Sequence, residues 1–232
     1  MLIGGLQRLT LIDYPGKIAA TLFVQGCNFR CPFCHNSPLV IKTTKPIPEV
    51  DIRAYLEARK RFLDAVVISG GEPTLQKDLP DFCKKLKSLG FLVKIDTNGS
   101  NPDMLKLLVK EKLVDFIAMD IKTALTKKDY EKTIGTKVNI AKIKKSIDIV
   151  KKFKEHEFRT TCVPGLINEK ELLSIGKYLK KKGANKTYYL QQFQPHNTLD
   201  KSFESMTPYT ESELRKFQKT LEPFFEFIGV RT

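Results

Sequence analysis

The chain has 232 residues, 41% of them hydrophobic, which suits one domain over residues 1–232, and no apolar run is long enough to cross a membrane. The N-terminus lacks the basic region and sustained apolar core of a signal peptide, so we expect a cytoplasmic protein. The net charge of +14 would suit an acidic partner, nucleic acid or a phosphorylated ligand, but the lysines are spread along helices without the arginine–aromatic interleaving of RNA platforms, so nucleic acid is not the expected substrate.

Apolar, β-branched runs alternate along the chain with segments of helical periodicity. Strands are predicted over residues 18–24, 65–69, 91–96, 114–119, 158–163, 187–192 and 224–230. Helices are predicted over residues 48–62, 79–89, 102–112, 140–153, 169–182 and 212–221, whereas residues 123–138 look irregular. Strands that alternate with helices indicate βαβ units and a parallel sheet with right-handed crossovers. Six such units suit a partial barrel, and a doubly wound open sheet fits the pattern as well.

Three of the five cysteines, Cys27, Cys31 and Cys34, fall within eight residues directly after the first predicted strand. In α/β folds this end of a strand is where sites are built. Three thiolates at this spacing can hold a [4Fe–4S] cluster, which normally takes four, and would leave one iron open. A zinc site that adds His35 is chemically allowed, although adjacent ligands rarely reach one metal without strain, and a disulfide is a poor fit. The other two cysteines are expected to be core residues: Cys83 and Cys162.

The segment Gly26-Cys27-Asn28-Phe29-Arg30-Cys31-Pro32-Phe33-Cys34-His35-Asn36 resembles the C-x-x-x-C-x-Φ-C signature of radical S-adenosylmethionine (SAM) enzymes. With Tyr14-Pro15-Gly16-Lys17 ahead of it, the chain is similar to glycyl-radical-enzyme activases, above all those of anaerobic ribonucleoside-triphosphate reductase, with pyruvate formate-lyase activases as near relatives. The resemblance covers most of the chain and is strong in its first two-thirds. It implies a radical SAM partial (β/α)6 barrel and a [4Fe–4S] cluster with SAM as second cofactor. Cys27, Cys31 and Cys34 would bind the cluster, and Phe33 and Asn36 would contact the adenosine part of SAM.

The resemblance also assigns roles at the ends of the next two predicted strands. Taken alone, Ser69-Gly70-Gly71-Glu72-Pro73 is typical of a plain βα turn. It resembles the G-G-E-P motif of the superfamily, which implies that the backbone of Gly70 and Gly71 and the carboxylate of Glu72 receive the SAM amino group. Asp96 precedes an Asn-Gly turn, and in activases this region supports the SAM site, sometimes through a monovalent cation.

Asp120 and Lys122 follow at the next strand end, on one face of the strand by alternation, and could form a simple surface ion pair. The D-x-K pattern resembles the pyruvate formate-lyase activase branch, in which the lysine meets the SAM carboxylate and the aspartate organises the site. Arg159, ahead of a V-P-G sequence, resembles the arginine that lies near SAM and the peptide in that branch, with an ion pair at the barrel rim as the alternative. Relatives often have a tyrosine–histidine pair after the sixth strand. Here Gln194 stands in that place and His196 two residues later, and the spacing does not decide between them.

The resemblance implies that a reduced cluster gives one electron to SAM, which splits into methionine and a 5′-deoxyadenosyl radical, with reduced flavodoxin or ferredoxin as electron donor. The chain is short and has no second cysteine cluster, which fits an enzyme that acts on a glycine of a protein loop. The expected partner is a glycyl radical enzyme, anaerobic ribonucleotide reductase. The alternatives are activation of pyruvate formate-lyase or another glycyl radical enzyme, a small-molecule reaction like that of 7-carboxy-7-deazaguanine synthase, and a non-catalytic zinc-binding module. The D-x-K and V-P-G features favour the activase over the last two.

Overall fold

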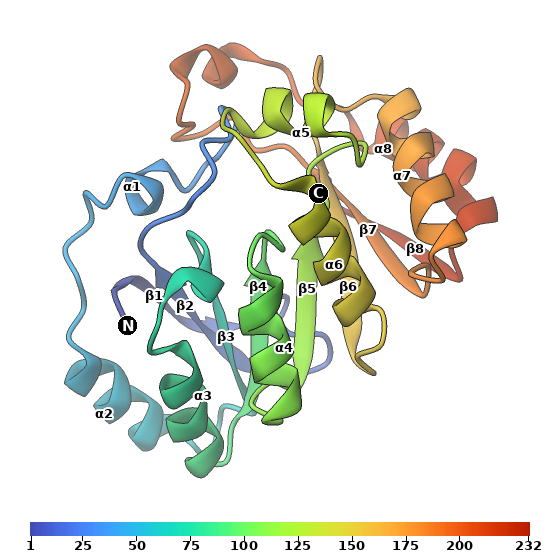
Figure 1. Cartoon of the computed structure of the whole chain (residues 1–232). Coiled ribbons are helices and arrows are strands. Elements are labelled where there is room, and N and C mark those ends of the chain that lie inside the picture. Colours follow the sequence, from blue (N-terminus) through green and yellow to red (C-terminus); the bar gives the residue numbers. More distant parts are fainter. The chain divides into compact units, whose positions relative to one another are not determined.

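The computed structural model describes residues 1–232 (Figure 1). These residues fall into two units. Unit 1 comprises Met1–Asn28, Pro38–Thr97 and Asp103–Ile117, and unit 2 comprises Phe29–Ser37, Asn98–Pro102 and Ala118–Thr232. Eight strands follow one another in chain order in a sheet that is mostly parallel and is not closed. The predicted α/β fold with a parallel sheet is therefore confirmed, while the single domain stays a prediction.

Unit 1 contains four complete strands and the helices that connect them. The strands are β1 (Ile3–Thr10), β2 (Ala19–Val24), β3 (Ala65–Gly70) and β4 (Leu92–Thr97). The helices are α2 (Glu49–Arg59), the 3₁₀ helix η1 (Pro73–Leu75) and α3 (Leu79–Ser88), while α1 (Ser37–Val40), α4 (Pro102–Lys110) and strand β5 (Phe116–Asp120) cross a border of the unit. β1 runs antiparallel to β2, whereas β2, β3 and β4 are mutually parallel. Because Val24 pairs with Gly70, the loops after β2 and β3 leave the sheet side by side.

Unit 2 contains three parallel strands, β6 (His156–Cys162), β7 (Thr187–Gln192) and β8 (Phe227–Arg231). Its helices are α5 (Lys127–Ile134), α6 (Ile140–Val150), α7 (Glu169–Lys181) and α8 (Glu211–Leu221), with two 3₁₀ helices, η2 (Lys201–Ser205) and η3 (Glu222–Phe224). Helices α7 and α8 both begin with a capping box. In it, the side chain of the residue just before the helix accepts a hydrogen bond from the backbone N–H of a glutamate, and the glutamate side chain accepts one from the N–H of that residue. No helix of the chain combines the length and the apolar character needed to cross a membrane.

Each predicted strand and helix is present with small shifts at its ends, but strand β1, helices α1 and α5 and the three 3₁₀ helices were not predicted. Strand β1 carries Gly4 and Gly5, which weaken a strand signal. Gly4 is required by packing, because a Cβ there would lie 2.4 Å from Oγ1 of Thr44. Helix α5 lies inside the stretch predicted as irregular, and it is short. Its ends are fixed by the cap of Thr126 and by Gly135 in the left-handed conformation.

The two cysteines expected in the core are buried, as predicted. Cys83 lies in α3 and Cys162 in β6. Burial raises the pKa of each of these thiols to about 12, so both stay protonated at neutral pH.

Candidate functional site

The loop after β3 lies directly on the backbone that leads into Cys27. The N–H of Gly71 donates to the carbonyl of Val24 at 2.8 Å, and the N–H of Glu72 donates to the carbonyl of Gly26 at 2.9 Å. A Cβ at Gly71 would lie 2.1 Å from the oxygen of Gly26, and one at Gly70 would lie 2.7 Å from the nitrogen of Val24. Gly70 also has a φ of +101°, which disfavours residues with a side chain. Both glycines of the G-G-E-P sequence are therefore needed for this close approach.

The Glu72 carboxylate is fully buried at the start of this loop. Its Oε1 accepts hydrogen bonds from the Thr74 hydroxyl at 2.5 Å, the Thr74 N–H at 3.1 Å and the Thr97 hydroxyl at 2.7 Å. Glu72 thus caps η1 and ties the end of β3 to the end of β4. Its role toward the SAM amino group stays a prediction, and these hydroxyls fix the position of the carboxylate that would perform it.

Asp96 is engaged in a buried ion pair that the sequence analysis missed. Its Oδ1 lies 2.7 Å from Nζ of Lys94, and its Oδ2 accepts a hydrogen bond from the Ser69 hydroxyl at 3.0 Å. Lys94 is only 1% exposed, and its ammonium lies 5.6 Å from the ring centroid of Phe116. A lysine two residues before an aspartate in an otherwise apolar strand was the available signal for this pair, because both side chains share one face.

Replacing Gly71 by alanine is expected to displace the G-G-E-P loop and to lower the free energy of unfolding by about 3 kcal/mol. The reason is the 2.1 Å approach of the new Cβ to a backbone oxygen, which no side-chain movement can relieve. Gly5→Ala is the matched control, since its Cβ would lie 3.4 Å from the Phe23 ring, and we expect a change within about 1 kcal/mol. Urea denaturation of the three proteins measures both effects. Equal stability of Gly71→Ala and the wild type would contradict the packing described here.

In unit 2, the segment that contains the second and third cysteines of the triplet is held from two sides. At one side, the N–H of Arg30 donates to the carbonyl of Ile134 at the end of α5, at 2.9 Å. A Cβ at Gly135 would lie 2.4 Å from the oxygen of Arg30, so the glycine that ends α5 also admits this segment. At the other side, the N–H of Asp200 donates to the carbonyl of Pro32 at 2.9 Å.

The residues after β7 also reach this segment. The Ser37 hydroxyl donates to the carbonyl of Asn197 at 2.7 Å. The two candidates from the sixth strand end, Gln194 and His196, therefore lie in a stretch that contacts the chain just after the cysteines, and both are exposed. Their roles stay predictions, and the structure does not select one of them.

The last two cysteines of the triplet lie in one turn, and opposing effects act on the Cys34 thiol. The N–H of Cys34 donates to the carbonyl of Cys31 at 3.0 Å, which forms a tight turn. Burial raises the pKa of the Cys34 thiol, and the backbone N–H of Asn36 and the positive charge of Lys122 offset only part of this effect. Iron–sulfur ligation requires the thiolate, and the Lys122 ammonium is the side chain that favours it here. No group of three or more His, Cys, Asp or Glu side chains is arranged to hold a single metal ion, and the ligand set of Cys27, Cys31 and Cys34 stays a prediction from spacing.

The three other residues of this segment that the sequence analysis considered differ in exposure. Phe33 is buried, Asn36 is half-buried and His35 is exposed. The adenosine contacts assigned to Phe33 and Asn36 stay predictions.

Asp120, Lys122 and Arg159 form one connected ion-pair cluster. Asp120 Oδ2 lies 2.8 Å from Nζ of Lys122, and Asp120 Oδ1 lies 2.5 Å from Nε of Arg159. Burial alone would raise the pKa of Asp120, but the charges of Arg159 and Lys122 outweigh it and hold the pKa well below its ordinary value. Burial would lower the pKa of Lys122, but Asp120 outweighs it and keeps the pKa raised, and Cys31 and Cys34 act in the same direction when they are thiolates. The structure therefore brings together three of the predicted residues and places Lys122 within electrostatic reach of two of the cysteines.

Two residues that the sequence analysis missed extend this cluster. Glu157, 1% exposed in β6, accepts two hydrogen bonds from Arg231 of β8, at 2.7 and 2.8 Å. Burial alone would lower the pKa of Arg231, but the hydrogen bonds and charge of Glu157 raise it. The Arg231 guanidinium also lies 3.5 Å from the ring centroid of Tyr189. A glutamate two residues before Arg159 in a strand was the only signal for this pair, because its partner lies 74 residues away.

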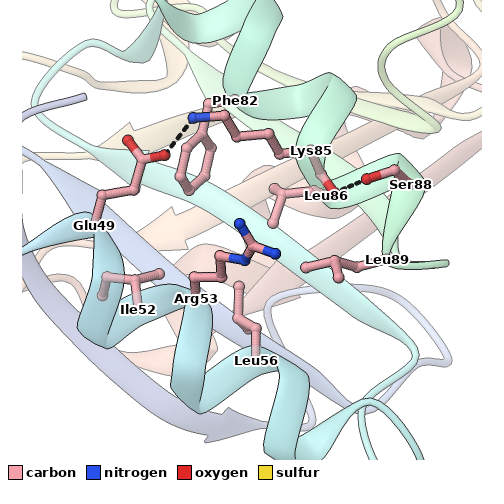
Figure 2. Close-up of a pocket in the computed structure, with 9 residues that line it drawn as sticks. All are labelled: Glu49, Ile52, Arg53, Leu56, Phe82, Lys85, Leu86, Ser88 and Leu89. Atoms are coloured by element: carbon pink, nitrogen blue, oxygen red, sulfur yellow. Dashed lines mark hydrogen bonds and ion pairs between the residues drawn. The ribbon is translucent and has the colours of Figure 1, made fainter.

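One pocket lies apart from all of these residues, between α2 and α3 of unit 1 (Figure 2). Glu49 and Lys85 form an ion pair at 2.6 Å at the edge of the pocket, and the Arg53 side chain points from α2 into the pocket. Its apolar lining consists of Ile52, Leu56, Phe82, Leu86 and Leu89. The pocket contains none of the residues predicted for the site.

Comparison with known proteins identifies the family. Residues 21–179 match the radical SAM superfamily. The chain belongs to the radical SAM superfamily. Along its full length this radical SAM protein is 37% identical to MJ1227 of Methanocaldococcus jannaschii, and the match covers 96% of MJ1227. MJ1227 is provisionally named a glycyl-radical enzyme activating enzyme. It is also 30% identical to the pyruvate formate-lyase-activating enzyme of Staphylococcus epidermidis, over 75% of this chain and 73% of that enzyme.

The fold agrees with this assignment. The crystal structure of Streptococcus suis SuiB bound to S-adenosylmethionine matches 91% of the chain with a TM-score of 0.68 and 16% identity. The radical SAM chain spans about half of SuiB, 52% of its length. Radical SAM enzymes use a [4Fe–4S] cluster and SAM, so the predicted cofactors are those of the family. The prediction of a radical SAM enzyme related to glycyl-radical enzyme activating enzymes is thus confirmed, and neither the zinc-binding module nor the small-molecule alternative is favoured.

Proposed function

We propose that this radical SAM enzyme cleaves SAM reductively at a [4Fe–4S] cluster bound by Cys27, Cys31 and Cys34, and so generates a glycyl radical on anaerobic ribonucleoside-triphosphate reductase. The observation that carries the proposal is the full-length similarity to a protein named as a glycyl-radical enzyme activating enzyme. When bound, the cluster and SAM supply the one-electron chemistry that removes a hydrogen atom from a glycine Cα. The rest of the work falls to side chains of this chain.

Two cations of the ion-pair cluster suit the carboxylate of SAM. The ammonium of Lys122 and the guanidinium of Arg159 share Asp120 as an anchor, so both are held in place before a ligand arrives. The Lys122 side chain is 16% exposed and that of Arg159 is 12% exposed, which leaves each a small accessible surface. A cation that is held in a partly dry site binds a carboxylate more strongly than one in open water.

The amino group of SAM is assigned to the loop after β3. Gly70 and Gly71 let this loop pack on the backbone that leads into Cys27, and Glu72 adds a negative charge for the ammonium group. Asp96 supports this region through its pair with Lys94. The adenosine part is assigned to Phe33 and Asn36, with His196 as a further candidate.

The choice of partner rests on the resemblance of Tyr14-Pro15-Gly16-Lys17 and of the cysteine segment to activases of the anaerobic reductase. Pyruvate formate-lyase is the second candidate, because pyruvate formate-lyase-activating enzymes are among the relatives. The electron donor we propose is reduced flavodoxin or ferredoxin. The net charge of +14 would suit an acidic protein in that role.

The test is anaerobic reconstitution with iron and sulfide, followed by reduction and incubation with SAM and either the anaerobic reductase or pyruvate formate-lyase. We expect 5′-deoxyadenosine and a glycyl EPR doublet on the anaerobic reductase. A doublet on pyruvate formate-lyase alone would keep the activase and change its partner. If no 5′-deoxyadenosine forms with the reduced enzyme, the proposal of SAM cleavage is wrong.

A further inference from the structure

Five charged side chains on β5, β6, β8 and the residues next to them form an alternating series. In order, they are Lys122, Asp120, Arg159, Glu157 and Arg231. Three cations thus surround two carboxylates, all within unit 2. The predicted SAM residues account for the first three members of the series. The proposed function gives no role to the last two.

Arg159 lies between two carboxylates and approaches one of them much more closely than the other. Its Nε lies 2.5 Å from Asp120, whereas its closest approach to Glu157 is 3.9 Å, which is too long for a hydrogen bond. Glu157 precedes Arg159 by two residues in the same strand, so the two side chains share one face of β6. A pair within β6 would therefore need only a rotation of side chains.

Arg231 competes with Arg159 for Glu157. Its guanidinium donates to both oxygens of Glu157, at 2.7 and 2.8 Å, which is the bidentate arrangement that arginine makes with carboxylates. Glu157 is 1% exposed, so without Arg231 it would be a buried charge in need of a new partner. Arg159 is the nearest other cation.

Arg231 is itself held rigidly. Its guanidinium stacks on Tyr189 at 3.5 Å from the ring centroid. The ring of Tyr189 lies over Gly229, where a Cβ would come within 2.5 Å of it. Gly229 in β8 therefore admits the ring on which Arg231 rests.

We propose that Arg231 is a positioning residue for the SAM site, because by occupying Glu157 it leaves the Arg159 guanidinium on Asp120. Strand β8, for which the sequence suggested no functional residue, thereby belongs to the machinery of the site. The inference rests on the proposed function only in that Arg159 faces SAM.

The experiment compares Arg231→Met with the double variant Arg231→Met/Glu157→Gln. In the single variant Glu157 is expected to capture Arg159, and the affinity of the reconstituted enzyme for SAM should fall about tenfold. In the double variant the competing carboxylate is gone, Arg159 should return to Asp120, and the affinity should recover to within about threefold of the wild type. The matched control is Arg215→Met, which breaks an exposed arginine–glutamate pair in α8 and should leave SAM affinity unchanged.

Two readouts decide the outcome. Equilibrium dialysis of SAM gives the affinities, and crystal structures of the two variants give the position of the Arg159 guanidinium. Loss of affinity in both variants alike, or an Arg159 that stays on Asp120 in Arg231→Met, would overturn the proposal. If the wild type binds no SAM, the proposed function fails, while the two crystal structures still decide whether Arg231 positions Arg159.

Discussion

Replacing Cys34 by alanine is expected to lower the iron that the protein binds on anaerobic reconstitution by at least about tenfold, and to abolish cleavage of SAM. A cluster with three cysteine ligands already has one iron without a protein ligand, and Cys34→Ala leaves two thiolates, so a second iron loses its protein ligand as well. Cys34 is half-buried in a tight turn with Cys31, and an alanine at this position has no atom that can bind iron. Iron and sulfide analysis, together with the optical absorption of the reconstituted protein, measures the effect.

Cys83→Ala is the matched control, since it removes one thiol from the same chain. Cys83 is fully buried in α3 among core residues, and burial raises the pKa of its thiol to about 12. We expect this variant to bind iron like the wild type and to lose only some stability from the smaller side chain. Equal loss of iron in both variants would show that the metal binds to thiols without selection, and the assignment of the triplet would then be wrong.

The parallel part of the fold could be predicted from sequence because its strands are apolar runs of the expected length. Strands β2 and β3 are buried along nearly their whole length, as strands covered on both faces are. Strand β1 carries two glycines and pairs antiparallel, so its sequence is not the continuous apolar run that marks the buried parallel strands. Helix α5 was missed because its eight residues make too few turns to show a helical periodicity, although its capping residues were visible in the sequence.

For the candidate site, local spacing was informative and pairing between distant strands was not. The alternation of Asp120 and Lys122 predicted one shared face, and the structure shows an ion pair there. The Glu157–Arg231 pair depends on the order β6, β7, β8 and on their register, and neither can be read from single residues. A lysine inside an apolar strand, such as Lys94, indicates that an acidic partner is needed, but only the structure identifies that partner as Asp96.

Asp120→Asn is expected to destabilise the protein by about 3 kcal/mol at neutral pH, because it leaves two partly buried cations without their shared anion. Lys122 and Arg159 are each bonded to Asp120, at 2.8 and 2.5 Å, so one substitution breaks two ion pairs. Asparagine has nearly the same shape and can still accept a hydrogen bond, which separates the effect of charge from that of packing. Urea denaturation of the protein without cofactors gives the difference in free energy of unfolding.

The pH dependence of that difference identifies its cause. The pKa of Asp120 is held below its ordinary value in the folded protein, so the carboxylate stabilises the folded state fully above the ordinary pKa of about 3.9. This contribution is lost as the pH falls toward the lower, folded-state pKa, because the carboxylate is then protonated in both states. The difference in free energy of unfolding between wild type and Asp120→Asn should therefore be constant from about pH 6 to 8 and shrink below about pH 4.

Glu211→Gln, which breaks the exposed pair with Arg215, is the control and should change stability by no more than about 0.5 kcal/mol. A gap that persists undiminished in acid would mean that Asp120 acts through its shape and hydrogen bonds, and that the two cations do not depend on its charge.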